Sequence, residues 1–194
     1  NLRAGSYAQT ASTLSGAEGG DDSVAGFTTA SNNYTVAQLA LTGGAIGPSS
    51  STYASALTPG AVSFANVVVG DLVGGTVGVN TSTLSTSGNP IVGSYTQTAS
   101  ATLSGADSGN YSLAGGFTSG ANYTINKLAL TGAAIASNTT TYAATLAPGA
   151  VSFGNIVAGD LVTDTASVNT STLSTAGNPI VGSYTQTASA TLSG

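Results

Sequence analysis

The sequence predicts an all-β fold, organised as tandem small β-sandwich domains with an 89-residue repeat. Three observations predict it. Apolar and polar residues alternate over short stretches, turn-forming residues recur between those stretches, and long segments of the chain occur twice. No stretch has the spacing of apolar residues that is typical of an amphipathic helix. These patterns favour strands and turns over helices.

The internal repeat is visible in several matching segments. Residues 51–64 match residues 140–153, which lie 89 positions further along the chain. Residues 89–105 recur unchanged as residues 178–194, and residues 1–16 are a diverged copy with one residue fewer. A period of 89 residues is too long for one coil of a solenoid, and it has the size of a small domain.

The strand signal is clearest over residues 94–103. One side of this stretch carries Tyr95, Gln97, Ala99, Ala101 and Leu103, and the other carries Ser94, Thr96, Thr98, Ser100 and Thr102. A period of two is typical of a half-buried strand, so we expect the first set to face the core. The residues expected to be buried are Tyr95, Ala99, Leu103, Val62 and Phe64, with their repeat counterparts Tyr184, Ala188, Leu192, Val151 and Phe153.

Further strands and turns follow from local composition. The β-branched run 67–69 predicts a short buried strand. Turn signals separate the apolar stretches at Pro59-Gly60, Gly70-Asp71, Gly88-Asn89-Pro90 and Asp107-Ser108-Gly109-Asn110. Several short strands with frequent turns indicate an Ig-like β-sandwich, and units of β-grasp-like topology are the alternative.

The domain boundaries are placed where the alternation changes phase, across Asn126 and Lys127. We expect residues 1–36 to be the C-terminal part of a preceding repeat. Residues 37–125 are expected to form a complete β repeat domain, and residues 126–194 a following repeat that lacks its last strands. The sequence contains no Met, so we expect it to be a segment of a longer protein.

Charge and composition exclude several function classes. The formal net charge is −5, and the only cations are Arg3 and Lys127. Nucleic-acid binding and polybasic membrane contacts require clustered Lys and Arg, so neither is expected. No apolar run approaches the length of a membrane span, so no membrane insertion is expected in this segment. Without His or Cys, the Ser–His and Cys–His arrangements of nucleophilic catalysis are impossible.

The acidic residues supply the remaining candidates for a site. Only Asp71 and Asp160 match across the repeats, and both lie in Gly-Asp-Leu-Val turns, where Asp commonly bonds to nearby backbone N–H groups. Calcium prefers several carboxylate oxygens, so Asp21 with Asp22, or Asp160 with Asp164, are weak calcium candidates. No catalytic or cofactor-binding residue is predicted, and we expect no enzyme activity.

A family resemblance rests on a set of motifs spread over most of the chain. They are the segments 103–113, 122–125, 127–131 and 147–153, together with Tyr142. The set resembles the YDG/MBG-type tandem repeats of filamentous-haemagglutinin-like large bacterial adhesins, which are exoproteins of the two-partner-secretion type. The Tyr-Asp-Gly signature itself is absent, since Tyr53-Ala-Ser and Tyr142-Ala-Ala stand in its place. The resemblance implies a long bacterial surface protein that acts in adhesion and biofilm cohesion.

We therefore expect the structural repeat region, a stalk or spacer, of an extracellular bacterial adhesin or surface filament. Its partners would be adjacent repeats or other copies of the protein, with surface polysaccharide as a further partner. One alternative is a subunit of a filament that self-assembles by strand exchange. Another is a carbohydrate- or ice-binding β module, in which Tyr side chains stack on sugars or the Ser and Thr row of residues 94–102 contacts ice.

Overall fold

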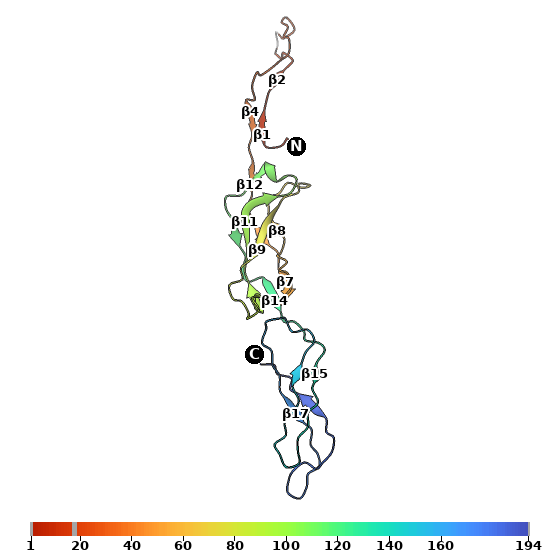
Figure 1. Cartoon of the computed structure of the whole chain (residues 1–194). Coiled ribbons are helices and arrows are strands. Elements are labelled where there is room, and N and C mark those ends of the chain that lie inside the picture. Colours follow the sequence, from red (N-terminus) through yellow and green to blue (C-terminus); the bar gives the residue numbers. More distant parts are fainter. Residues whose placement is uncertain (1, 17–18, 194) are drawn as a thin grey trace. The chain divides into compact units, whose positions relative to one another are not determined.

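The structure, a computed structural model, describes residues 2–16 and 19–193. Strands make up nearly all of its regular structure, and one short 3-10 helix is the only helical element in the described residues. The all-β class predicted from the sequence is therefore confirmed (Figure 1). The elements are β1 Gly5–Tyr7, β2 Thr10–Ala11, β3 Phe27–Thr28, β4 Tyr34–Val36, β5 Leu39–Ala40, β6 Ala45–Ile46, β7 Ser49–Thr52, β8 Val62–Ser63, β9 Gly74–Val79, β10 Gly93–Tyr95, β11 Gln97–Ser104, η1 Ser108–Asn110, β12 Tyr111–Ser112, β13 Phe117–Thr118, β14 Tyr123–Asn126, β15 Ala134–Ile135, β16 Val151–Ser152, β17 Ala166–Val168 and β18 Gln186–Ala188.

The chain divides into two compact units, and each is assembled from separate stretches of sequence. The first unit comprises Asn1–Ser50, Leu57–Asn80 and Ser94–Thr124; the second comprises Ser51–Ala56, Thr81–Gly93 and Ile125–Gly194. The sequence boundaries expected after residues 36 and 125 concern the repeats, and they stay a prediction.

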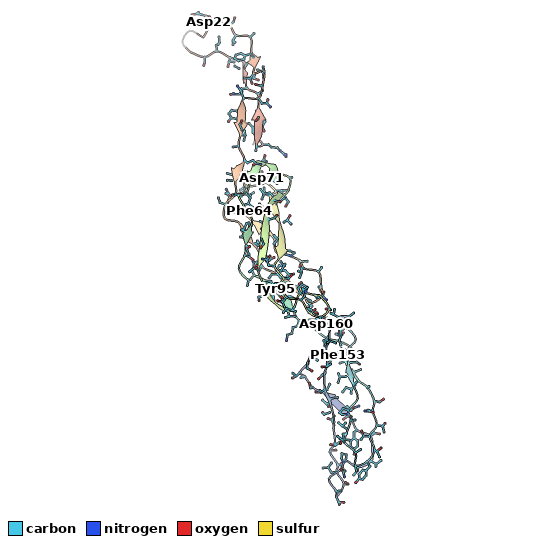
Figure 2. The ribbon with its side chains drawn as sticks, turned by 60° about the vertical axis from the view of Figure 1, so that its left-hand side comes forward. Asp22, Phe64, Asp71, Tyr95, Phe153 and Asp160 are labelled. Atoms are coloured by element: carbon cyan, nitrogen blue, oxygen red, sulfur yellow. The ribbon has the colours of Figure 1, made fainter. Side chains whose placement is uncertain are left out.

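The first unit begins with a two-stranded arrangement that we call the N-terminal hairpin, residues 2–16 and 19–36. Its strands β1 and β4 pair antiparallel with Tyr7 opposite Tyr34, and β2 pairs with β3 so that Ala11 lies opposite Phe27. Phe27 and Tyr34 are 60% and 50% exposed. Figure 2 shows Asp22 on the loop that joins the two halves of this hairpin. The hairpin therefore carries large apolar side chains without a core of its own.

The centre of the first unit is a sheet in the order β13-β11-β9. Both pairings are antiparallel, and a register shift in the β11–β9 pairing lies between Ala99 and Leu103. Phe117 of β13 meets Phe64 edge to face, with ring centroids 6.1 Å apart. A second sheet has the order β10-β14-β7. The buried apolar side chains of the described chain are Leu41, Ile46, Ala99, Tyr111, Tyr123 and Ile125.

The predicted alternation holds where β11 is regular. Gln97 and Ala99 are buried and Ser100 is exposed, as the period of two requires. Ala101 is exposed, because the register shift interrupts the alternation beyond Ala99. The other residues expected to be buried are half-buried, except Leu192, which is exposed. Sheets of two or three strands cover their apolar faces only in part, so full burial is confined to a few positions.

The strand predicted at residues 67–69 is wrong. These residues form a loop and a turn, in which Asp71 donates its backbone N–H to the carbonyl of Val68 at 3.0 Å. Gly70 has a φ of 97°, a conformation that suits glycine and ends any extended run. Val69 is consequently fully exposed.

One strand pairing of the second unit matches a pairing of the first at an offset of 89 residues. Ile135 of β15 pairs with Val151 of β16, as Ile46 of β6 pairs with Val62 of β8. Strand β17 pairs antiparallel with β18. Residues 136–150 and 169–185 contain no assigned strand, although the counterparts of these stretches in the first half of the chain include β7 and β10.

Candidate functional site

Gln97 is the centre of a buried hydrogen-bond network in the first unit. Its side chain is the only polar one that is fully buried in the part of the chain that the structure describes. The Gln97 Nε2 donates to the Gly47 carbonyl at 3.1 Å and to Asn122 Oδ1 at 2.8 Å. The Gln97 Oε1 accepts the backbone N–H of Gly60 at 2.7 Å, and Ser119 Oγ accepts the Gln97 backbone N–H at 2.9 Å. A buried amide is tolerated only when its donors and acceptors are paired, as they are here.

Two other glutamines, at matching positions of the sequence, each make some of the side-chain hydrogen bonds that Gln97 makes. Gln186, in the second unit, accepts the backbone N–H of Gly149 at 2.6 Å and donates to the carbonyl of Ala136 at 3.2 Å. Gln9, in the N-terminal hairpin, donates instead to Asn33 Oδ1 at 2.8 Å. Gln186 thus bonds the counterparts of Gly47 and Gly60, whereas Gln9 bonds the counterpart of Asn122. Only Gln97 has both.

A cavity of about 740 Å³ lies in the second unit. It is lined by residues 137–144 and 179–184, together with Leu146, Ala147 and Gln186 among others. Residues 138–141 and 182–184 are the counterparts, 89 positions further on, of β7 and β10, which flank β14 in the sheet order β10-β14-β7. We call this cavity the strand slot, because it lies where a counterpart of β14 would run.

Strand β14 shows how such a position is filled. Ser49 donates its backbone N–H to the Asn122 carbonyl at 3.2 Å, and Tyr53 donates to the Asn126 carbonyl at 2.8 Å. The equal sequence step on both sides is the pattern of a parallel pairing. The Tyr123 hydroxyl accepts the backbone N–H of Thr58 at 3.1 Å, and the Tyr123 side chain is fully buried.

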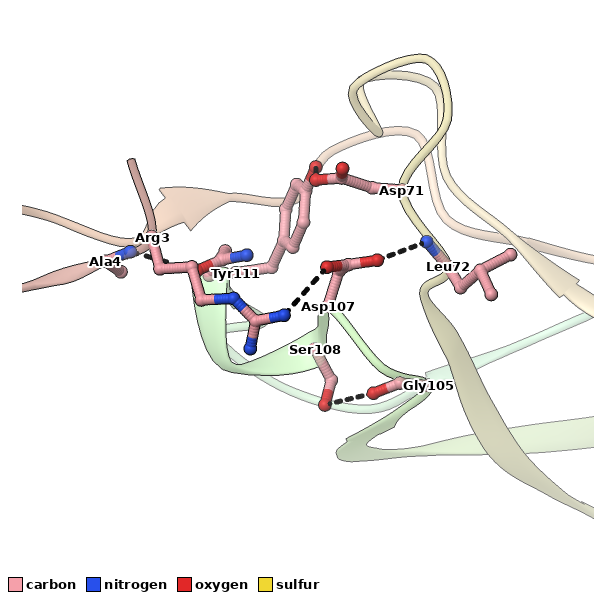
Figure 3. Close-up of polar contacts among 9 residues, drawn as sticks. Arg3, Ala4, Asp71, Leu72, Gly105, Asp107, Ser108 and Tyr111 are labelled. Atoms are coloured by element: carbon pink, nitrogen blue, oxygen red, sulfur yellow. Dashed lines mark hydrogen bonds and ion pairs between the residues drawn. The ribbon is translucent and has the colours of Figure 1, made fainter. Parts of the chain in front are cut away.

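The two aspartates of the Gly-Asp-Leu-Val turns both accept a hydrogen bond from a tyrosine. In the first unit Tyr111 donates its hydroxyl to Asp71 Oδ2 at 2.6 Å (Figure 3). The same hydroxyl accepts the backbone N–H of Val68 at 3.0 Å. Burial, followed by the hydrogen bond to Asp71, raises the pKa of Tyr111 above its ordinary value of 10.0. The hydroxyl therefore stays protonated at neutral pH and ties β12 to the turn.

A second carboxylate stands beside this pair. Asp107 Oδ2 accepts the backbone N–H of Leu72 at 3.0 Å, and Asp107 Oδ1 lies 3.9 Å from the guanidinium of Arg3 (Figure 3). The Arg3 side chain is largely exposed, so this ion pair contributes little to stability.

In the second unit Tyr53 donates its hydroxyl to Asp160 Oδ1 at 2.8 Å and lies 2.6 Å from Ser85 Oγ. The hydrogen bond from the Ser87 side chain, followed by that from Tyr53, holds the pKa of Asp160 below its ordinary value of 3.8, against the opposing effect of burial. Thr86 Oγ1 also donates to the Gly159 carbonyl at 3.0 Å. These bonds join residues that belong to consecutive sequence repeats.

The weak calcium candidates are spread over separate surroundings. Asp164 Oδ1 accepts the Thr165 backbone N–H and the Ser189 hydroxyl, both at 2.7 Å. Asp21 and Asp22 are exposed on the N-terminal hairpin. Within residues 2–16 and 19–193, no group of three or more acidic residues is close enough to hold a metal ion. Calcium binding by a pair of carboxylates stays a hypothesis.

Two hydroxyls of the Ser and Thr row, those of Thr96 and Thr98, are bonded within the sheet. Asn80 Nδ2 donates to Thr96 Oγ1 at 2.8 Å and to Thr98 Oγ1 at 2.9 Å. Thr98 Oγ1 also lies 2.9 Å from Thr118 Oγ1. Such cross-strand bonds stabilise the sheet and leave fewer hydroxyls for an external lattice.

Sequence reasoning missed the role of the glutamines: it placed Gln97 on the apolar side of a strand and predicted no hydrogen-bond network around it. Gln9, Gln97 and Gln186 occupy matching positions in the three copies of one segment. A polar residue that recurs on the apolar side of a strand is a signal for a buried hydrogen-bond network, since an unpaired amide would be costly there.

Comparisons of the chain with family models, with curated proteins and with solved structures found no match. None of the helical structure in the described residues is long and apolar enough to cross a membrane.

Proposed function

We propose that the chain is a structural repeat region, a stalk or spacer, of an extracellular bacterial adhesin or surface filament that acts in adhesion and biofilm cohesion. The recurrence of one set of core hydrogen bonds at a fixed sequence offset supports this proposal. Gly60 donates to Gln97 as Gly149 donates to Gln186. Tandem copies of one β-sandwich unit give a protein length without a new fold for each segment.

The side-chain bonds to Asn80 support the same reading. Asn80 bonds Thr96 and Thr98, and Asn169 makes the same two bonds to Thr185 and Thr187, each at 2.9 Å. A scaffold must reproduce its internal bonds from copy to copy, whereas a binding site is under no such demand.

The bonds between consecutive repeats suit a spacer. The Tyr53–Asp160 pair and the Thr86–Gly159 pair tie one repeat segment to the next without a free linker. A firmly bonded junction transmits force along the chain and holds a distal binding region away from the cell. This function needs no catalytic residue, and we propose none.

A carbohydrate- or ice-binding module is the weaker candidate. Tyr53 and Tyr111 use their hydroxyls in bonds to Asp160 and Asp71, and Thr98 bonds to Thr118. The hydroxyls of these side chains are therefore engaged in hydrogen bonds within the chain. Adhesion through a spacer does not depend on them.

The proposal is tested on the organism that carries the gene. Antibodies raised against residues 1–194 and applied to intact cells should label material outside the cell envelope in immunogold electron micrographs. Cells from which the gene is deleted should lose the label and form less cohesive biofilms. Labelling that requires lysis of the cells contradicts the extracellular location, and specific binding of the purified chain on a glycan array favours the carbohydrate-binding alternative.

A further inference from the structure

Strand β9 leaves one edge of the central sheet open. The sheet order is β13-β11-β9, so β9 is paired with β11 on one side only (Figure 1). Asn80 donates its backbone N–H to the Thr96 carbonyl at 3.0 Å, and hydrogen-bonded positions alternate along an antiparallel pair, so Gly78 also bonds β11. The backbone N–H and C=O groups of Val77 and Val79 therefore point away from β11. Among the described residues, no strand pairs with these groups from the other side.

The surroundings of β9 leave this edge accessible. A Cβ atom at Gly75 would lie 3.5 Å from the Val62 side chain, so β8 packs against the inner face of β9. The outer face is open, because a Cβ atom at Gly78 would meet nothing within 4 Å and the neighbouring Thr76 and Asn80 are exposed. Backbone groups at a free edge bond either to water or to another strand.

The edge of β9 lacks the features that usually prevent strands from pairing between molecules, which are short length, charge and proline. Strand β9 has six residues and no proline, and no charged residue occurs between Asp71 and Asp107. The opposite edge of the sheet, β13, has only two residues. In the second unit β17 is an edge strand as well, but it has three residues and follows Asp164, where the first unit has Gly75. The edge of β9 is therefore the least protected of the three.

The sequence of β9 is suited to pairing with itself. In an antiparallel pair with a twofold axis at Gly78, Val77 of one copy lies opposite Val79 of the other, and each such pair exchanges two hydrogen bonds. Gly78 then faces Gly78 at the non-hydrogen-bonded position, where the Cα atoms are only about 4.5 Å apart. Since neither glycine has a side chain, the strands meet without a clash. The next pair on the outer face, Thr76 with Asn80, is short, polar and uncharged.

We infer that the β9 edges of two copies of this chain pair antiparallel around Gly78, so that one continuous sheet spans both molecules. The partner is a second copy, because the twofold arrangement matches every outward N–H and C=O group of Val77 and Val79 with its complement. The pairing exchanges no strand and leaves each copy folded as it is. It is a property of the chain itself, and it does not depend on the location or role proposed above.

The first test measures the mass of the full chain by sedimentation equilibrium, up to the limit of its solubility. The monomer has a mass of 18.5 kDa, and the wild-type chain should approach twice this mass as its concentration rises. One strand edge is a small contact, so we expect a weak dimer that requires high concentration. A wild-type chain that stays at the monomer mass over the whole range overturns the inference.

A pair of charge variants tests the position of the twofold axis. Gly78→Lys and Gly78→Asp each place like charges directly opposite one another in the dimer, so each variant alone should remain monomeric. Their mixture places opposite charges there and should form one-to-one dimers, which also shows that both variants are folded. Gly120→Lys is the matched control, because Gly120 is exposed and a Cβ atom there also meets nothing within 4 Å. It should associate like the wild type.

Amide hydrogen exchange, followed residue by residue by NMR, identifies the edge that pairs. The amides of Val77 and Val79 face water in a single copy, so their exchange should slow several-fold as the dimer forms. The amide of Gly78 is already bonded to β11, and its exchange should change little. Dimers in which Val77 and Val79 exchange as fast as in the monomer overturn the inference. Association of Gly78→Lys alone at the wild-type level, or a mixture of the two charge variants that stays monomeric, overturns it as well.

Discussion

At the scale of single residues, stability in the first unit depends on a few buried polar positions. Gln97 joins three separate stretches of chain, through Gly47, Gly60 and Asn122. An unpaired group in this place costs more than its bond contributes when made, because water cannot reach it.

Replacement of Gln97 tests this directly. Gln97→Leu leaves the N–H of Gly60 and the carbonyl of Gly47 without the partner that Gln97 supplies, so we expect the free energy of unfolding to fall by about 2–4 kcal/mol. Gln9→Leu is the matched control, because Gln9 is exposed, and its effect should stay below about 1 kcal/mol. Urea titration of both variants measures the difference. Equal effects of the two substitutions would show that the network contributes no more than a surface bond.

Gly60 makes the closest backbone approach in the network. A Cβ atom at this position would lie 1.9 Å from the Gly47 carbonyl oxygen, a distance that no side chain tolerates. We expect Gly60→Ala to lower the free energy of unfolding by about 2–3 kcal/mol, because the two backbone segments must separate. Gly78→Ala, where a Cβ would meet nothing within 4 Å, is the control. A thermal melt that leaves the two variants alike would contradict this.

The carboxylate of Asp160 gives a pH dependence with a defined sign. Its pKa is lower in the folded chain than the ordinary value of 3.8, so the stabilisation that it supplies is complete above pH 3.8 and is lost as the pH falls through the folded-state pKa. Asp160→Asn should flatten the decline of the melting temperature in this acid range. Ser87→Ala removes the largest cause of the shift and should flatten it in part. An unchanged acid profile in both variants would refute the assignment.

At the scale of elements, the period-two pattern predicted β11 and its neighbours because the side chains of a strand alternate regardless of sheet size. The prediction failed at residues 67–69, where composition favoured a strand but Gly70 forces a turn. It also failed at Ala101, since nothing in the alternation signals a register shift. β-propensity reflects how well a side chain packs in a strand that is already paired with a neighbour. The structure assigns no paired strand to residues 67–69.

The turn at Ala54, which follows β7, and its counterpart at Ala143 share a strained backbone conformation. Ala54 and Ala143 have φ values of 63° and 65°, a left-handed conformation that disfavours side chains with a Cβ. Ala54→Gly should therefore raise the free energy of unfolding by up to about 1 kcal/mol. The gain is smaller if the flexibility of glycine in the unfolded chain offsets it. Ala56→Gly, in the same loop, is the control, and chemical denaturation of both distinguishes relief of strain from loop flexibility.

At the scale of the whole molecule, the scarcity of charge determines how the chain responds to its solution. A net charge of −5 with two cations leaves one weak ion pair, Arg3–Asp107, in the residues that the structure describes. We expect added salt to change the free energy of unfolding by less than about 0.5 kcal/mol, because screening has little to act on. Chemical denaturation at low and high sodium chloride measures this. A large salt effect would show that electrostatics stabilise the fold.

The sequence alone predicted the all-β class, because this class depends on patterns that are written along the chain. The organisation into 89-residue repeat domains stays a prediction. The strand slot could not be predicted in detail. It depends on which backbone segments approach one another, and Gln186, which lines it, bonds residues 50 and 37 positions away along the chain. The tyrosine partners of Asp71 and Asp160 were missed for the same reason, since Tyr53 lies 107 positions from Asp160.

The close approach at Gly60 has a consequence for how the repeats diverge over time. A mutation that converts this codon to any other amino acid places atoms on the Gly47 carbonyl, and Gly149 stands in the same relation to Ala136. Selection should therefore hold these two glycines fixed while the Ser and Thr positions around them drift between interchangeable hydroxyl residues. Among natural variants of the gene, substitutions are expected to be absent at Gly60 and Gly149 and frequent on the outer strand faces. Deep sequencing of a mutagenised library selected for folding would record that difference as a depletion of every non-glycine codon at both positions.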